Sequence, residues 1–389
     1  MARPPAPLLR ALISPVAPRA HYGQASRAAA VRAFASTSTV RADPPKVPVA
    51  LISKIRSARP GTPLLLARSA LVAANNDLEA ALAWIAEQAT ESGAAKAEKL
   101  SGRAAEQGLV AVAVLADGSG GVGVRASLVE MRCETDFVAR TDEFRELAEG
   151  IARSLAFFAE PTAGAAAHQL VKLDPQATAL LETPVVPSPS KVAELAVSSD
   201  VAPHETVKSC LASVVSRLGE NIRLHRAASI ALEPTMPSST SAAAPVFLAS
   251  SYLHGSKTPA AAAADGVQSG LLGGLLISRL PSSAAPKMDA AEVKGLLRAL
   301  ARQVVAIPTA SIQAAGESAA PTESGEPSTA LYEQSLITMS PSAKFEFEAG
   351  SKVGDVLNKW SQARGVEGAG LEVVELARWG LGEADEAQA

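Results

Sequence analysis

The residues with the most distinctive chemistry lie in the octapeptide 133–140, which reads Cys-Glu-Thr-Asp-Phe-Val-Ala-Arg. Asp136 stands beside Phe137 where a predicted β-strand ends and a helix begins, so a charge and a large apolar ring are offered side by side. Packing of a core does not require this pair at such a junction. Two simpler interpretations stay open: Phe137 can be a core aromatic at a strand end, and Asp136 can cap a helix or form a turn.

Cys133 raises a different possibility, an enzyme that uses a cysteine nucleophile together with a histidine. Such chemistry needs a histidine and an orienting group within hydrogen-bond reach of the thiol. His168, His204 and His225 show no spacing to cysteines or acids that indicates a triad or a metal site. We therefore predict no catalytic residues, no metal and no cofactor, and we interpret Cys133 as a small core residue.

Composition narrows the class of protein. The 389 residues carry a formal net charge of −3, whereas nucleic-acid-binding domains usually present a basic surface. Hydrophobic residues make up 48% of the chain but aromatics only 4%, so the cores must be built mainly from Ala, Val and Leu. No apolar run approaches the ~18 residues that suggest a membrane-spanning helix. We expect neither direct nucleic-acid binding nor a membrane protein.

The N-terminal stretch has a separate character. Residues 1–42 contain arginines, Ser, Ala and Pro but no acid, and Asp43 is the first carboxylate. This composition is typical of a mitochondrial transit peptide, and the alternative is an ordinary basic tail. Arg32-Ala33-Phe34 resembles a matrix-protease cleavage site. We assign residues 1–45 as transit peptide and lead, and we expect the mature protein in the mitochondrial matrix.

Residues 46–92 predict a module of short helices. Pro63 can start the second helix, because its missing N–H is not needed there. Asn75 and Asn76 suit a tight turn, and Asp77 can cap the third helix. Three helices in so short a segment resemble a ubiquitin-associated (UBA-like) fold, with any other three-helix bundle as the alternative.

Residues 93–233 predict the first subdomain of an α+β core. The apolar runs 109–115 and 122–131 flank a glycine-rich turn at 117–121, which indicates an antiparallel hairpin. Thr141, followed by two acids, is a plausible helix start.

A helix over 203–218 and a strand over 222–232 complete this subdomain. The alternation in that strand predicts that Ile222, Leu224, Ala228, Ile230 and Leu232 share one face, and Arg226 breaks the pattern.

Residues 234–380 predict a second core subdomain, which gives an α+β chain of antiparallel strands and helices after the UBA-like module. The segment 314–328, rich in Ala, Ser, Pro and Glu, is interpreted as a disordered insertion, and residues 381–389 as a tail. The expected elements are strands at 246–253, 270–280 and 371–379, and helices after Asp289 and over 353–364.

The octapeptide closely resembles the signature of elongation factor Ts, and further segments match that family in the same order. The helical module fits through Ala70-Leu71 and through residues 74–79. The match spans roughly residues 47–379. The other matching segments are 99–110, Leu218-Gly-Glu-Asn-Ile-Arg223, Tyr252-Leu-His-Gly255 and Val353-Gly-Asp-Val-Leu357.

This resemblance implies a guanine-nucleotide exchange factor without covalent chemistry. The implied partner is mitochondrial elongation factor Tu, in its GDP-bound and nucleotide-free states. Asp136 and Phe137 would reach into the GTPase domain and disturb the site that holds Mg²⁺ and the β-phosphate. The remaining implied contacts are Thr135, Val138, Leu218, Gly219, His254 and Arg68.

The sequence departs from the family ahead of Arg68. Residues 60–65 replace the family's Thr-Gly-Ala-Gly-Met-Met, and Arg68-Ser69 replaces a lysine pair. Arginine keeps the charge of lysine but not its geometry, which suggests a co-adapted partner. The alternative function is a binding module or chaperone of a GTPase, which would leave GDP release unchanged.

Overall fold

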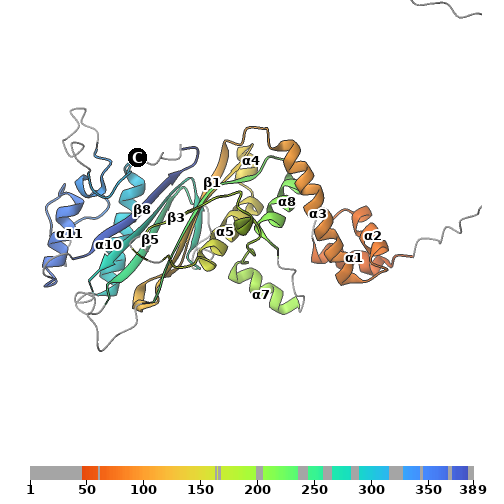
Figure 1. Cartoon of the computed structure of the whole chain (residues 1–389), viewed down its shortest axis with the longest axis horizontal. Coiled ribbons are helices and arrows are strands. Elements are labelled where there is room, and N and C mark those ends of the chain that lie inside the picture. The colour runs from red at the N-terminus through yellow and green to blue at the C-terminus, as the bar shows by residue number, and fades with distance from the viewer. Residues whose placement is uncertain are drawn as a thin grey trace, which may run out of the picture. The chain divides into compact units, whose positions relative to one another are not determined.

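The computed structural model describes residues 46–59, 62–162, 164, 168–198, 205–234, 244–256, 265–281, 289–314, 327–341, 345–366 and 370–383. The predicted transit segment, most of the insertion at 314–328 and most of the tail lie outside these residues. Within them, helices combine with antiparallel sheets, which confirms the α+β class (Figure 1).

A three-helix module opens the described chain, with α1 (Val49–Ala58), α2 (Leu64–Ala73) and α3 (Leu78–Leu100). Asp77 caps α3 as predicted, since its carboxylate accepts the Ala80 N–H at 2.9 Å. Asn75 and Asn76 take the positive φ values, 50° and 66°, that a tight turn requires. The helices enclose a small apolar core of Ile55, Ala67, Ala70, Leu71, Ala81 and Ile85.

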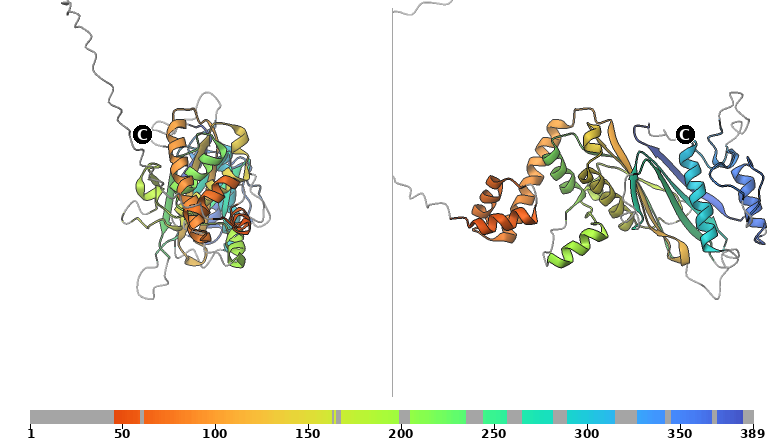
Figure 2. Two further views of the ribbon diagram at one scale, coloured as in Figure 1. Left: turned by 90° about the vertical axis from the view of Figure 1, so that its right-hand side faces the viewer. Right: turned by 180° about the vertical axis from the view of Figure 1, so that it is seen from behind.

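Helix α3 continues beyond residue 92, where the sequence suggested the end of the module, and packs against α8 (Val207–Leu218) (Figure 2). Gly93 lies at this contact. A Cβ atom on Gly93 would stand only 2.1 Å from the Ala212 carbonyl oxygen, so the close approach depends on glycine. Lys96 adds a hydrogen bond of 2.9 Å to the Ser216 carbonyl. These contacts fix the module to the core.

Gly93→Ala should therefore destabilise the protein, although alanine is the better helix former by about 1 kcal/mol. The added methyl group must push α3 away from α8, and we expect a loss of about 1–3 kcal/mol in the free energy of unfolding. Urea unfolding measures it. Gly295→Ala is the matched control, because Gly295 lies in a helix with nothing within 4 Å of its Cβ position, and it should stabilise. Equal behaviour of the two variants would contradict the close packing.

The described part of the chain forms two antiparallel sheets, ordered β3-β4-β2-β1-β6 and β5-β7-β8. The predicted strand 270–280 divides at Leu271: β6 joins the first sheet beside β1, and β7 joins the second. The first sheet contains β1 (Gln107–Asp117), β2 (Val124–Cys133), β3 (Val171–Leu173), β4 (Arg223–Leu232) and β6 (Val267–Gly270). The second contains β5 (Val246–His254), β7 (Leu272–Leu280) and β8 (Glu372–Gly380).

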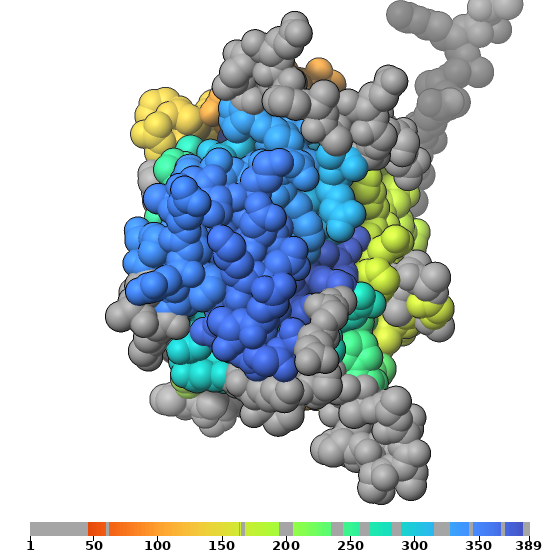
Figure 3. Space-filling view, turned by 90° about the vertical axis from the view of Figure 1, so that its left-hand side faces the viewer, coloured from red at the N-terminus to blue at the C-terminus, as the bar shows by residue number. Residues whose placement is uncertain are grey.

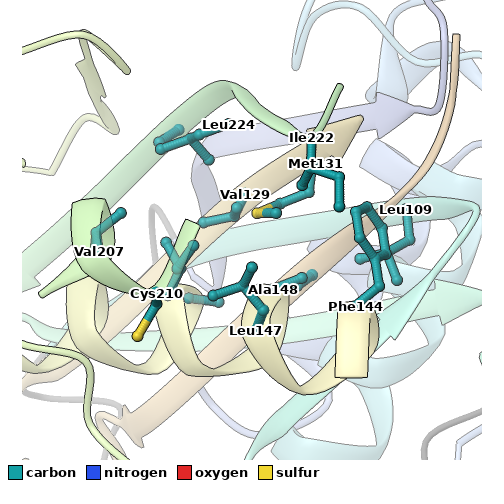
Figure 4. Packing of buried hydrophobic residues seen from close by; sticks show 14 of the residues in the cluster. Leu109, Val129, Met131, Phe144, Leu147, Ala148, Val207, Cys210, Ile222 and Leu224 are labelled. Carbon is teal, nitrogen blue, oxygen red and sulfur yellow. The ribbon is translucent and has the colours of Figure 1, made fainter. Parts of the chain in front are cut away.

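The sheets pack face to face, and helices cover their outer faces. Helix α5 (Asp142–Phe157) and α8 enclose a core on the first sheet (Figure 4). Helices α10 (Ala290–Ala306) and α11 (Val353–Gln362) pack into the core on the second sheet. Residues of the last part of the chain, in blue, form much of the surface seen from this side of the molecule (Figure 3). Between the sheets lie Val110, Val112, Leu128, Ile230, Leu253, Leu275 and Ile277.

Strand β4 corrects the predicted alternation. The register against β2 shifts between Glu130 and Met131, so that Glu130 opposes Arg226 and Met131 opposes Leu224. Because of this β-bulge, the alternating side chains of β4 change faces of the sheet at the shift. The interpretation that all five apolar residues share a face is therefore wrong: Ile222 and Leu224 pack under α5 and α8, whereas Ile230 and Leu232 pack between the sheets.

Short elements complete the fold, several of them in a stretch that carries little pattern in the sequence. They are η1 (Ser119–Gly121), α4 (Asp136–Ala139), α6 (Thr178–Leu181), α7 (Pro189–Ser198) and η4 (Leu331–Glu333).

Candidate functional site

Helix α4 is a single turn that presents Phe137 to solvent. Its N-cap is Thr135, whose hydroxyl accepts the Val138 N–H at 3.3 Å. Val138 is only 8% exposed and packs into the core under α5, so in this conformation its side chain anchors the turn. Phe137 is 79% exposed, which excludes a core aromatic at this position. A large ring held in water on an anchored turn is available for contact with another molecule.

Asp136 lies in the first turn of α4, and the cap is its neighbour Thr135. The Asp136 carboxylate forms an ion pair of 2.8 Å with Arg140, and the two side chains are 46% and 66% exposed. Exposed pairs of this kind contribute about 0–1 kcal/mol. A partner can therefore draw the carboxylate away from Arg140 at little energetic cost.

A reciprocal set of hydrogen bonds joins this turn to the segment after α8. The Glu220 carboxylate accepts the Thr135 N–H at 3.1 Å and the Thr135 hydroxyl at 2.5 Å. In return, the Glu134 carboxylate accepts the Asn221 N–H at 2.6 Å, and the Asn221 amide donates to the Arg103 carbonyl at 2.7 Å. Sequence reasoning did not single out Glu134, Glu220 or Asn221. The available signal was the polar Glu-Asn pair inside the matched segment 218–223.

Leu218 and Gly219 belong to the same junction. Leu218 ends α8, and Gly219 is its C-cap with φ 73°, a left-handed conformation that glycine adopts without strain. The Gly219 N–H donates to the Val215 carbonyl at 2.9 Å, and the residue is exposed. The hydrogen bonds of Glu220 and Asn221 therefore bring these two predicted residues next to the α4 turn.

His254 lies at the same end of the sandwich. Cys133 pairs with Gln107 at this end of the hairpin, and Val110 pairs with Gly270. The chain then turns at Leu271 into β7, where Leu272 pairs with His254. His254 is exposed, and Leu271 beside it is 55% exposed. The sheet register thus brings the α4 turn, the end of α8 and His254 at the end of β5 to one end of the sandwich.

Arg68 lies away from that end of the sandwich, on α2 of the helical module. Its side chain is exposed, and within the described ranges the structure shows no hydrogen bond or ion pair to the guanidinium group. Leu64 and Leu65 are 56% and 74% exposed on the same helix, so α2 presents two leucines and an arginine. The fold does not place Arg68 beside Phe137, and any common partner must reach both elements.

The two cysteines are buried and free, which confirms the interpretation of Cys133 as a core residue. Burial, followed by the nearby charge of Glu220, raises the pKa of the Cys133 thiol to about 12. Burial and the charge of Glu205 raise the pKa of the Cys210 thiol to about 12 as well. Reactive cysteines have lowered pKa values, so this environment does not suit a nucleophile.

We expect both thiols to resist alkylation in the folded protein. At pH 8 the thiolate population should be roughly a thousandfold lower than in the unfolded chain, in addition to the steric protection. Because the folded pKa lies above the unfolded value of 9.0, burial of the neutral thiols stabilises the protein below pH 9. That contribution is lost as the pH rises from 9 towards 12. Iodoacetamide labelling followed by mass spectrometry measures the protection, and rapid labelling of native Cys133 would contradict it.

Two further observations bear on the chemistry. Among the described residues, no group of three or more His, Cys, Asp or Glu side chains could hold a metal ion. No helix in this part of the chain is long and apolar enough to cross a membrane. The site consists of an exposed ring, an acid and a turn held by carboxylates, an arrangement that suits contact with another protein.

Comparison with known proteins agrees with the signature. Residues 134–264 match the family model described as elongation factor TS. Mitochondrial elongation factor Ts from Malassezia globosa is 32% identical, covering 90% of this chain and 92% of the relative. The Coprinopsis cinerea protein of that name is 35% identical over 87% of this chain and 93% of the relative, and the Mycosarcoma maydis protein 32% over 90% and 87%. This chain therefore belongs to the elongation factor Ts family of translation elongation factors.

Proposed function

We propose that this protein is the guanine-nucleotide exchange factor of mitochondrial elongation factor Tu and acts in the mitochondrial matrix. The observation that carries the proposal is Phe137, 79% exposed on a one-turn helix beside Asp136. Membership of the elongation factor Ts family and the mitochondrial names of the relatives support it. The acid-free, arginine-containing N-terminus fits import into mitochondria.

The proposed mechanism is exchange of binding energy, and no covalent bond is made or broken. Phe137 inserts into the GTPase domain and buries apolar area worth about 1.5–3 kcal/mol. Asp136, released from Arg140, adds a negative charge near the supports of the Mg²⁺ ion. Mg²⁺ bridges and neutralises the phosphates of a bound nucleotide, so displacing its supports weakens GDP binding. The factor thereby stabilises the empty GTPase.

Leu218, Gly219 and His254, at the same end of the sandwich, would extend the contact around Phe137. Helix α2 with Arg68 would form a second contact on the same partner. Linkage requires that GDP weakens binding of the factor by the same coupling free energy with which the factor weakens binding of GDP. Exchange then runs in either direction according to nucleotide concentration.

Release of a fluorescent GDP from mitochondrial elongation factor Tu tests the proposal. The protein starting at Ala35 should accelerate release, and the Asp136→Ala/Phe137→Ala double variant should lose most of the acceleration while remaining folded. Absence of acceleration by folded wild-type protein would overturn the exchange function. Stable complex formation without acceleration would instead identify a binding module or chaperone of the GTPase.

A further inference from the structure

We infer that Glu220 is a positioning residue for Phe137: its carboxylate holds the α4 turn in the conformation that presents the ring. This inference rests on the proposed exchange function and deepens it. Glu220 lies in the segment after α8, remote in sequence from the Phe137 ring that it would orient.

A four-residue helix is not stable by local interactions, because helix nucleation is unfavourable and one turn forms few hydrogen bonds. Val138 anchors one side of α4 in the core, whereas Phe137 makes no such contact and is 79% exposed. Burial of Val138 alone leaves the N-terminal end of the turn free to fray. Delivery of the ring in one orientation therefore needs a second restraint at Thr135.

Glu220 supplies that restraint through both of its oxygens. One oxygen accepts the Thr135 N–H at 3.1 Å, and the other accepts the Thr135 hydroxyl at 2.5 Å. Because the hydroxyl donates its proton to Glu220, its lone pairs face the Val138 N–H, which donates at 3.3 Å. The carboxylate thus fixes the backbone before the turn and also orients the cap within it. Hydrogen bonds to a charged group are stronger than neutral ones.

The hydrogen bonds of the residues on either side of Glu220 keep it in place. Its neighbour Asn221 is 5% exposed and is held by Glu134 at 2.6 Å and by the Arg103 carbonyl at 2.7 Å. Gly219 ends α8 on the other side of Glu220 with a hydrogen bond to Val215. The restraint on the turn therefore comes from the segment between α8 and β4, two elements that are packed in the core.

Hydrogen exchange tests the positioning role without a partner. In Glu220→Ala, the amides of Thr135 and Val138 should exchange about tenfold faster, since hydrogen bonds to a charged group contribute about that factor or more. The amides of α5 should be unchanged. Glu182→Ala, which removes an exposed carboxylate that pairs with Lys208 at 3.6 Å, is the matched control and should leave both regions as in wild type. Unchanged exchange at residues 135–138 would overturn the inference.

A double-mutant cycle tests the consequence for exchange. Glu220→Ala should slow GDP release at saturating factor by about tenfold in the wild-type background but by less than about twofold in the Phe137→Ala background. A general loss of stability would lower both backgrounds by the same factor, and that result would overturn the inference. Glu220→Gln keeps the side-chain volume and one acceptor, so it should be intermediate. It carries the test if Glu220→Ala unfolds.

Failure of the inference and failure of the proposed function are distinguishable. If wild-type protein does not accelerate GDP release, the exchange function fails, while hydrogen exchange still reports whether Glu220 holds the turn. If wild-type protein accelerates release and Glu220→Ala matches it, the exchange function stands and the positioning role is overturned.

Discussion

Phe137→Ala is expected to slow factor-dependent GDP release by roughly 10–150-fold, the equivalent of the 1.5–3 kcal/mol that burial of the ring provides. The ring is 79% exposed in the free protein, so its apolar area is available to be buried against a partner. For the same reason its removal should change the free energy of unfolding by no more than about 0.5 kcal/mol. The assay is release of fluorescent GDP as a function of factor concentration, with thermal unfolding measured alongside.

Phe157→Ala is the matched control for this prediction. Phe157 is also an exposed aromatic, at 58%, but it lies at the far end of α5 and belongs to none of the predicted contacts. It should leave GDP release unchanged, whereas Phe137→Leu should retain part of the activity because it keeps apolar volume. If Phe137→Ala and Phe157→Ala behaved alike, the ring at 137 would have no special role in exchange.

Glu130→Ala is expected to cause the largest loss of stability, about 3–5 kcal/mol, which is typical when one partner of a buried ion pair is removed. Glu130 is fully buried, and its carboxylate accepts from Arg132 at 2.7 Å and from Arg226 at 2.6 Å. Arg226 also donates to the Gly380 carbonyl at 3.2 Å and stacks over Trp379 at 4.5 Å. Arg226 thus links the two sheets while the Glu130 carboxylate holds it in place. Removal of that carboxylate takes an acceptor away from both Arg132 and Arg226.

Urea or thermal unfolding measures this loss, and Glu372→Ala provides the comparison. Glu372 forms an ion pair with Arg279 on the second sheet, and the two side chains are 32% and 45% exposed. Removal of such a solvent-accessible partner should change the free energy of unfolding by about 0–1 kcal/mol. A Glu130→Ala protein as stable as Glu372→Ala would show that the buried network does not hold the sheets together.

Local sequence signals predicted the elements where the governing contacts are local. Asp77, Thr141 and Asp289 were identified as helix starts, and each accepts a hydrogen bond from a backbone N–H of the following turn. The hairpin of β1 and β2 follows from two apolar runs around a glycine turn. Capping and turn formation depend on residues two to four positions apart, so the sequence contains what they require.

Patterns that depend on distant partners were predicted less well. Arg226 interrupted the expected alternation because a bulge, set by pairing with β2, turns β4 over and directs this arginine to buried Glu130. The division of residues 267–280 between the two sheets likewise depends on pairing with β1 and β5. Neither partner is close in sequence, and alternation alone does not reveal a register shift.

The octapeptide 133–140 and the ordered segments around it were sufficient to indicate the family, and they identified Asp136 and Phe137 as the candidate wedge. Which residues hold that wedge was decided by tertiary structure. Thr135 and Glu220 are 85 positions apart and meet only because the hairpin and β4 share a sheet. A sequence specifies the side chains that can bind, whereas their orientation is set by hydrogen bonds between distant segments, which form only when the chain folds.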